Sequence, residues 1–161
     1  MRRAEQVALA AALMGFVGCG GGSTSIDGPM GGSSPEQAVE VFLTAAQEGT
    51  RSLRAGNMSE ADKAYERMAA VFGTEAGSIR RSHPAGEVRD RMIVLAGCLR
   101  PDQFRLSGSP DPQAWSKKRT SVTVELKRDG QTVVLPFKLV LGRGERWFIE
   151  QIDLTASSFS C

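Results

Sequence analysis

Histidine, tyrosine and cysteine are scarce in this chain of 161 residues, which contains one histidine, one tyrosine and three cysteines. The single histidine, His83, has no second histidine and no neighbouring cysteine with which to form a metal-ligand spacing. It precedes Pro84 in a polar segment, and we interpret it as a residue at a helix start rather than as a general base. The sequence therefore predicts no metal, no cofactor and no histidine-based catalytic set.

A strong charge bias is also missing. The formal net charge is +2, and the two basic clusters, at 80–81 and 117–119, are short. Nucleic-acid-binding proteins concentrate many Lys and Arg side chains on one face. We therefore expect no nucleic-acid partner, and we interpret both clusters as solvated segments in a loop or at the start of a strand.

The sequence lacks an apolar run long enough for a permanent membrane-spanning helix. The N-terminal run, residues 7–17, has about half of the ~20 residues that a hydrocarbon core requires. It follows two arginines and leads into Gly18, Cys19 and a run of three glycines. A buried helix of the domain is the alternative, but these glycines would break it.

This layout resembles a bacterial lipoprotein signal peptide. The resemblance implies that a peptidase removes residues 1–18 by cutting between Gly18 and Cys19. Cys19 would then carry lipid, including palmitate, and hold the exported protein at a bacterial membrane. In a cell with two membranes, this would be the inner leaflet of the outer membrane. An ordinary secreted protein cleaved nearby is the alternative.

The cysteine count is consistent with export. If Cys19 carries lipid, Cys98 and Cys161 remain, which is enough for one disulfide in an oxidising compartment. That bond would tie the last residue to the middle of the chain and contribute on the order of 4 kcal/mol to stability. The alternative is that Cys98 is a small buried apolar residue and Cys161 a free thiol.

Composition divides the chain into segments. Residues 19–33 are rich in glycine and serine, and they are expected to form a flexible linker with an r.m.s. span of roughly 20 Å. A capping pattern at Ser34 marks the start of the folded domain, which is expected to span residues 34–155. A short tail, 156–161, follows. The length fits one domain.

Three amphipathic helices are expected in the first half of the domain. The first begins after Ser34, which forms a capping box with Gln37, and it ends near position 56. The second is expected at 59–73 and the third at 84–100, with a loop at 73–83 between them. Apolar residues repeat at helical spacing in each segment, namely Val39, Phe42, Leu43 and Ala46, then Ala61, Tyr65, Met68, Ala69 and Phe72, then Val88, Met92, Leu95, Ala96 and Leu99.

Beyond residue 101 the apolar period changes from 3.6 to 2, which predicts strands. A hairpin turn is expected at Asp129-Gly130. Pro136 indicates an edge position or a bulge. The last strand has apolar residues in both rows, so it is either buried on both sides or switches faces at a β-bulge. The expected strands lie at 104–106, 120–127, 133–141 and 147–154.

Three helices followed by about four antiparallel strands predict an α+β fold, with the helices packed on one face of a curved sheet. This order, with SPEQAVEVFL at 34–43, EADKAYERM at 60–68 and RWFIEQI at 146–152, resembles the nuclear transport factor 2-like superfamily, also called ketosteroid isomerase-like. In particular, it resembles the small exported bacterial lipoproteins of that superfamily. The resemblance implies a cone whose sheet and helices enclose a pocket, although the fold alone does not fix a function.

Four aromatic or phenolic side chains are candidates for lining such a pocket: Tyr65, Phe72, Phe137 and Trp147. For Tyr65 and Trp147, packing in the core is the alternative. Isomerases of the superfamily need a carboxylate base and buried acid donors, typically Tyr and a protonated Asp. Neither Asp90 nor Asp153 has a recognisable catalytic partner in the sequence, so we assign no catalytic residue.

The sequence favours a non-enzymatic envelope lipoprotein that binds a small apolar ligand or a protein partner. One alternative is a ketosteroid isomerase-like enzyme acting on a small hydrophobic substrate. The other is a homodimeric scaffold or interaction module, since superfamily members often pair through the exposed sheet face. In this chain the outward row of the strand at 120–127 is polar enough to stay solvated; it consists of Ser121, Thr123, Glu125 and Lys127.

Overall fold

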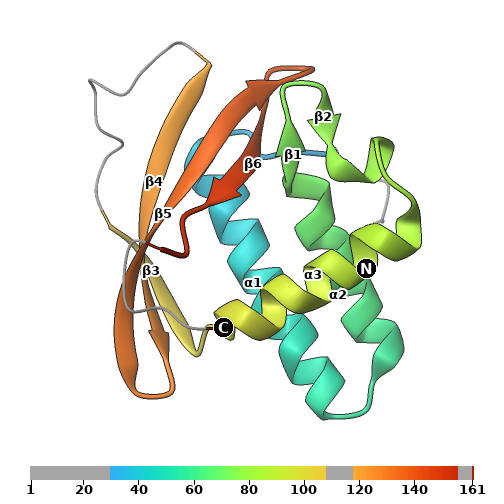
Figure 1. The fold of residues 1–161 in the computed structure, drawn as a ribbon, viewed down its shortest axis with the longest axis vertical. Coiled ribbons are helices and arrows are strands. Elements are labelled where there is room, and N and C mark those ends of the chain that lie inside the picture. Colours follow the sequence, from blue (N-terminus) through green and yellow to red (C-terminus); the bar gives the residue numbers. More distant parts are fainter. Residues whose placement is uncertain (1–29, 108–117, 156–160) are drawn as a thin grey trace, which may run out of the picture.

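The computed structural model describes residues 30–107, 118–155 and 161 (Figure 1). These residues form an α+β fold with three α-helices, a four-stranded antiparallel sheet and an additional two-stranded sheet, which confirms the predicted fold class. The elements in chain order are α1 (Pro35–Arg54), α2 (Met58–Val71), β1 (Gly73–Thr74), β2 (Gly77–Ser78), the 3₁₀ helix η1 (Ile79–Arg81), α3 (Ala85–Leu99), β3 (Gln103–Ser107), β4 (Arg119–Arg128), β5 (Gln131–Gly142) and β6 (Arg146–Ile152).

The first two helices begin at side-chain caps. Ser34 Oγ accepts a hydrogen bond from the backbone N–H of Gln37 at 3.1 Å, as the capping pattern predicts. In α2 the cap is Asn57, whose side-chain oxygen accepts from the N–H of Glu60 at 3.3 Å. The predicted start at Ser59 therefore lies inside the helix. Asn and Ser are nearly equivalent as caps, so the sequence did not decide between them.

The large sheet has the strand order β3-β4-β5-β6. Strands β4 and β5 pair along their length, with Val122 opposite Phe137. The turn between them contains Asp129 and Gly130 with φ values of 49° and 78°, as the predicted type I′ turn requires. The inner row of β4 is buried, as predicted, and consists of Thr120, Val122, Val124 and Leu126.

Pro136 lies in β5, a central strand, so the predicted edge position is wrong. The alternative, a bulge, does not fall at Pro136 either, because the register shift lies between Lys138 and Leu139. The carbonyl of Pro136 accepts from the N–H of Asp153 at 3.0 Å, just beyond the end of β6. The N and O of one strand residue point to the same side. The missing N–H is therefore directed past the last residue of β6, where it interrupts no pairing within that strand.

Strand β6 combines the two arrangements that its mixed pattern indicated. Lys138 pairs with Gln151 and Leu139 with Ile149, so Glu150 is the extra residue of a β-bulge. Phe148 and its neighbour Ile149 are both buried, which means that this part of β6 is covered on both faces.

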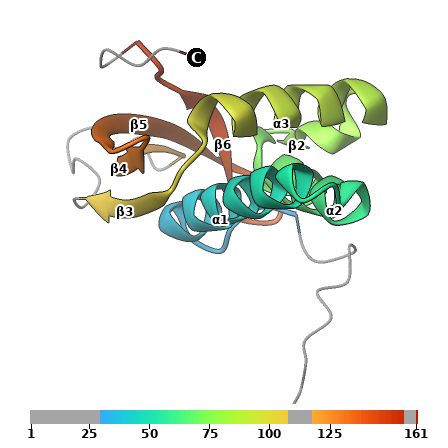
Figure 2. The ribbon, with the colours of Figure 1, turned by 90° about the horizontal axis from the view of Figure 1, so that it is seen from below.

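Figures 1 and 2 show α3 crossing α1 and α2, with the curved sheet beside them. Helix α1 lies against the inner side of the sheet. The ring of Phe42 lies 6.0 Å from that of Phe72 and 6.3 Å, edge-on, from that of Phe137 in β5, measured between centroids. The core thus joins the helical layer to the sheet.

Two short segments differ from the expectation. The expected loop 73–83 contains the small β1–β2 sheet and η1, and its Ser78 is buried with Oγ donating to the carbonyl of Ala69 at 2.6 Å. A strand of two residues is too short to show the alternation of apolar and polar residues from which strands are predicted, so the sequence carries no sign of this sheet. The end of the expected linker also joins the domain, because Gly31 donates to Ala70 and Gly32 exchanges backbone hydrogen bonds with Trp147.

Candidate functional site

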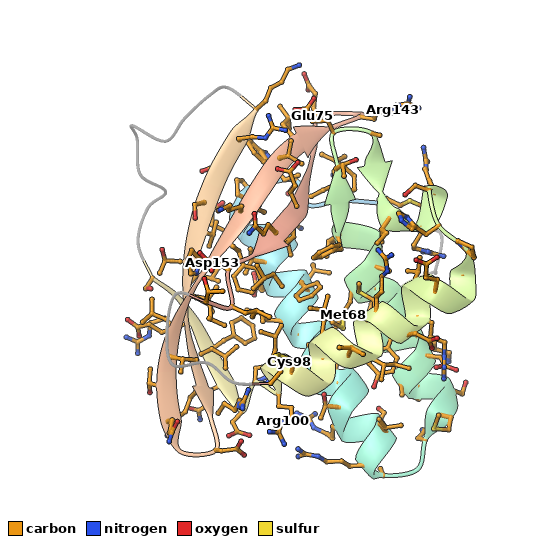
Figure 3. All side chains as sticks on the ribbon, viewed as in Figure 1. Met68, Glu75, Cys98, Arg100, Arg143 and Asp153 are labelled. Atoms are coloured by element: carbon orange, nitrogen blue, oxygen red, sulfur yellow. A yellow bond between two sulfur atoms is a disulfide. The ribbon has the colours of Figure 1, made fainter. Side chains whose placement is uncertain are left out.

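The space between the helices and the sheet is filled by apolar side chains. Figure 3 shows Met68 where α3 crosses the other two helices. Apart from Tyr65, the buried polar residues in the described ranges are Ser78 and Thr120, and neither is charged. The described interior therefore offers no carboxylate. Its largest fully buried side chains are Phe42, Phe137, Leu43, Met68, Met92 and Leu99.

A depression of about 500 Å³, which we call the apolar groove, runs beside α3. Its lining includes Glu87, Asp90 and Arg91, and Arg91 donates to Glu87 at 2.5 Å. Val94 has 69% of its surface exposed there. A mainly apolar lining with a few charged groups suits an apolar ligand. The apolar residues of its lining are Phe72, Ile79, Met92, Val94 and Leu95.

A second depression of about 350 Å³, the polar cleft, lies among α2, η1 and the start of α3. Helix α2 contributes Asp62, Tyr65, Glu66 and Ala69. Arg80 comes from η1, and α3 contributes Ala85, Gly86, Val88 and Arg89. Residues 87, 90, 91, 92, 94 and 95 of α3 line the apolar groove instead, so the two sites use different residues of one helix.

An ion pair stands beside the one tyrosine in the polar cleft. Arg89 Nε donates to a carboxylate oxygen of Asp62 at 2.7 Å. Burial raises the pKa of the Tyr65 hydroxyl above its ordinary value of 10.0, while nearby Arg89 lowers that pKa and Asp62 raises it. The hydroxyl is therefore protonated at neutral pH and able to donate a hydrogen bond.

The four candidate lining residues separate in the structure. Tyr65 lines the polar cleft and Phe72 the apolar groove. Phe137 is fully buried in the core, and Trp147 is half-buried in β6 opposite Gly32; neither belongs to the lining of these two sites. The sequence grouped these four residues because each belongs to an apolar stripe or row. Which of their rings reaches a surface depression depends on where α3 packs.

The remaining predicted site residues have different outcomes. Gly18 and Cys19 lie outside the described residues. Cys98, near the end of α3 (Figure 3), is paired with Cys161, and their Cα atoms are 4.7 Å apart. His83 lies just before α3, with Nδ1 2.9 Å from the hydroxyl of Ser82.

Sequence reasoning missed most residues of both sites. Arg80 was grouped with Arg81 as a solvated cluster, but Arg80 is half-buried in the polar cleft, and only Arg81 is exposed. The apolar groove had one signal: Val94 extends the apolar stripe of α3 beyond the width that one buried face needs.

Within the described ranges, no group of three or more His, Cys, Asp or Glu residues could hold a metal ion. None of the described helices combines the length and apolar character that crossing a membrane requires. Comparison of the chain with protein-family models, curated proteins and solved structures finds no match. The two depressions are therefore interpreted from their own residues.

Proposed function

We propose that this chain is an exported lipoprotein, anchored to a bacterial membrane through Cys19, whose domain binds a small apolar ligand without converting it. The observation that carries the binding role is the apolar groove. Its volume of about 500 Å³ falls within the roughly 300–1,000 Å³ of typical small-molecule sites. Five apolar side chains contribute to its lining, together with three charged side chains that can orient a ligand.

We further propose that the domain is nuclear transport factor 2-like. The support is architectural, because three helices precede four antiparallel strands in the chain, and α1 packs on the inner side of the sheet. The β-bulge at Glu150 and the curvature of the strands in Figure 1 are consistent with a cone. In this proposal the ligand occupies the groove beside α3, since large apolar side chains fill the interior.

Binding is favoured over ketosteroid isomerase-like catalysis. That chemistry requires a buried carboxylate next to a donor. The side chain of Asp90 is 78% exposed, and the carboxylate of Asp153 accepts from the Thr155 hydroxyl at 2.7 Å beyond the end of β6. Neither carboxylate lies in the described interior.

The groove is tested by the ligand that the full chain retains from cells. We expect solvent extraction and mass spectrometry to recover an apolar small molecule from the unmodified chain and much less from Val94→Lys. Val134→Lys is the matched control, because Val134 is 47% exposed on β5, away from the groove. Equal ligand in both variants, or none in the unmodified chain, would contradict the proposal. A polypeptide lost only from Val94→Lys would favour the protein-partner alternative.

The anchor is tested separately by Cys19→Ala. If Cys19 carries lipid, the substituted protein should move from the membrane fraction to the soluble fraction. Retention in the membrane fraction at the unmodified level would overturn this part of the proposal.

The homodimeric scaffold remains the third alternative, and its surface would be the outer face of the sheet. The outward side chains of β4 there are polar, so we expect a monomer. Analytical ultracentrifugation of the Cys19→Ala protein gives the mass directly, and a stable dimer would favour the scaffold.

A further inference from the structure

The polar cleft contains a hydroxyl group without a protein partner. Tyr65 is 2% exposed, and its ring lines the cleft. Its hydroxyl makes no hydrogen bond with any residue in the described ranges, and the hydroxyl oxygen is not among the fully enclosed unpaired atoms. A buried hydroxyl is normally hydrogen-bonded. The Tyr65 hydroxyl is therefore a hydrogen-bond donor at the cleft whose acceptor would be a ligand or a water molecule.

The start of α3, which also lines the cleft, has no side-chain cap, and the one acidic residue of its first turn, Glu87, is paired with Arg91. Helices α1 and α2 have side-chain caps, but α3 begins after Pro84, and no side chain accepts from its first turn. The free N–H groups and the helix dipole at such an end favour an anion. Ala85 and Gly86, the first two residues of α3, are part of the lining.

The charged side chains of the cleft leave one guanidinium for a ligand. Asp62 and Arg89 neutralise one another across 2.7 Å. Arg80 is half-buried and forms no ion pair with the residues that the structure describes. Glu66 is the other carboxylate of the lining, and it is exposed on α2 without an ion pair in those residues. An exposed carboxylate is screened by water more strongly than a charge on a partly buried residue such as Arg80.

We propose that the polar cleft is a second binding site, for a small molecule that joins an oxyanion, either a carboxylate or a phosphate monoester, to a compact apolar body. Arg80 and the start of α3 receive the oxyanion, and the Tyr65 hydroxyl donates a hydrogen bond to it. Ala69 and Val88 contact the apolar body. The volume of about 350 Å³ admits a single ring with its anionic group.

This site is independent of the proposed lipoprotein function and of the apolar groove. It uses other residues of α3, and its lining adds a tyrosine hydroxyl and the guanidinium groups of Arg80 and Arg89 to apolar side chains. A failure in one site would therefore leave the other intact.

The single tyrosine makes the site directly observable. In the full chain labelled with 3-fluorotyrosine, one fluorine resonance reports on Tyr65. Phenyl phosphate and benzoate are the probes, and benzyl alcohol is the neutral compound of similar size. We expect a saturable shift of the resonance with one or both anions and none with benzyl alcohol at equal concentration.

Two neighbouring arginines supply the matched variants. Arg80→Gln should weaken phenyl phosphate binding about tenfold, as loss of a charge-assisted hydrogen bond predicts. Arg81→Gln, one residue further and exposed, should change it by no more than about twofold. Tyr65→Phe, followed through the signals of the ligand, should weaken binding by about fivefold.

Three results would overturn the proposal. The first is the absence of a saturable shift with either anion. The second is equal binding of benzyl alcohol, which would reduce the cleft to an apolar depression. The third is an equal loss in the Arg80 and Arg81 variants, which would show that only net charge matters. If the cleft binds an anion, the tighter of the two probes identifies the oxyanion class.

Discussion

The ring of Tyr65 in α2 lies directly against Gly49 in α1. A β-carbon at position 49 would stand 2.6 Å from Cε1 and 3.1 Å from Cδ1 of that ring. Glycine in a helix interior costs about 1 kcal/mol relative to alanine, and the close approach of the ring explains why one is present here. The contact sets the position of Tyr65 between α1 and the polar cleft.

Gly49→Ala should destabilise the protein. The added methyl group gains about 1 kcal/mol of helix propensity, but overpacking against a buried ring costs about 1–3 kcal/mol. We expect a net loss of about 1 kcal/mol in the free energy of unfolding, measured by urea titration. Gly97→Ala in α3 is the control, because nothing lies within 4 Å of its added β-carbon. It should be neutral or stabilising, and an equal gain in both variants would contradict the contact.

The pKa of Tyr65 should respond to its two charged neighbours in opposite directions. Arg89 lowers that pKa and Asp62 raises it, while burial is the main cause of its elevation. Arg89→Gln should therefore raise the pKa of Tyr65 further, and Asp62→Asn should lower it. The phenolate absorbance of the one tyrosine measures both shifts. If both substitutions shift the pKa of Tyr65 in the same direction, Arg89 and Asp62 do not act on its hydroxyl from the positions described above.

Alkaline pH should destabilise the protein through the same hydroxyl. The pKa of Tyr65 in the folded state is above its ordinary value of 10.0, so the folded protein keeps a proton that the unfolded chain releases. The stabilisation is fully present below pH 10 and is lost as the pH rises through the folded-state pKa. Tyr65→Phe should remove this part of the pH dependence. Free energies of unfolding of both proteins between about pH 9 and 11 test it, and identical slopes would refute it.

Pairing of Cys98 with Cys161 should stabilise the domain. The pair closes a loop with a sequence separation of 63 residues, for which the chain-entropy relation gives about 4 kcal/mol. Cys161→Ser should lower the free energy of unfolding by about that amount, and dithiothreitol should have the same effect on the unmodified chain. The reductant should not change the stability of Cys161→Ser. If it does, another thiol reaction accounts for the loss.

The sequence predicted the elements whose signals are local. Ser34 and Gln37 placed the start of α1, and the alternation around Val122 together with Asp129-Gly130 placed the β4–β5 hairpin. Strand β6 stayed ambiguous because its bulge at Glu150 depends on the register of its neighbour. A bulge is a property of two strands, and one strand's sequence does not determine it.

The two depressions could not be predicted in the same way. Each depression combines residues of η1 and α3 with residues of α2 or, in the apolar groove, with Phe72 at the end of α2. The relative positions of these elements depend on the β1–β2 hairpin at 73–78. That hairpin has two residues per strand and leaves no periodic signal. Arg80 and Arg81 are adjacent and chemically identical, and only the turn of η1 directs the first into the polar cleft.

The joining of Gly32 to Trp147 determines where a mechanical load would enter the domain. Backbone hydrogen bonds of 2.8 and 2.9 Å connect these residues in both directions, and Arg146 donates to the carbonyl of Gly31 at 2.6 Å. Arg146 and Trp147 are the first two residues of β6, an edge strand of the large sheet. Gly31 also donates to the carbonyl of Ala70 in α2, so a force applied to the chain before Gly31 would be shared between the edge of the sheet and the helical layer before it reached the start of α1.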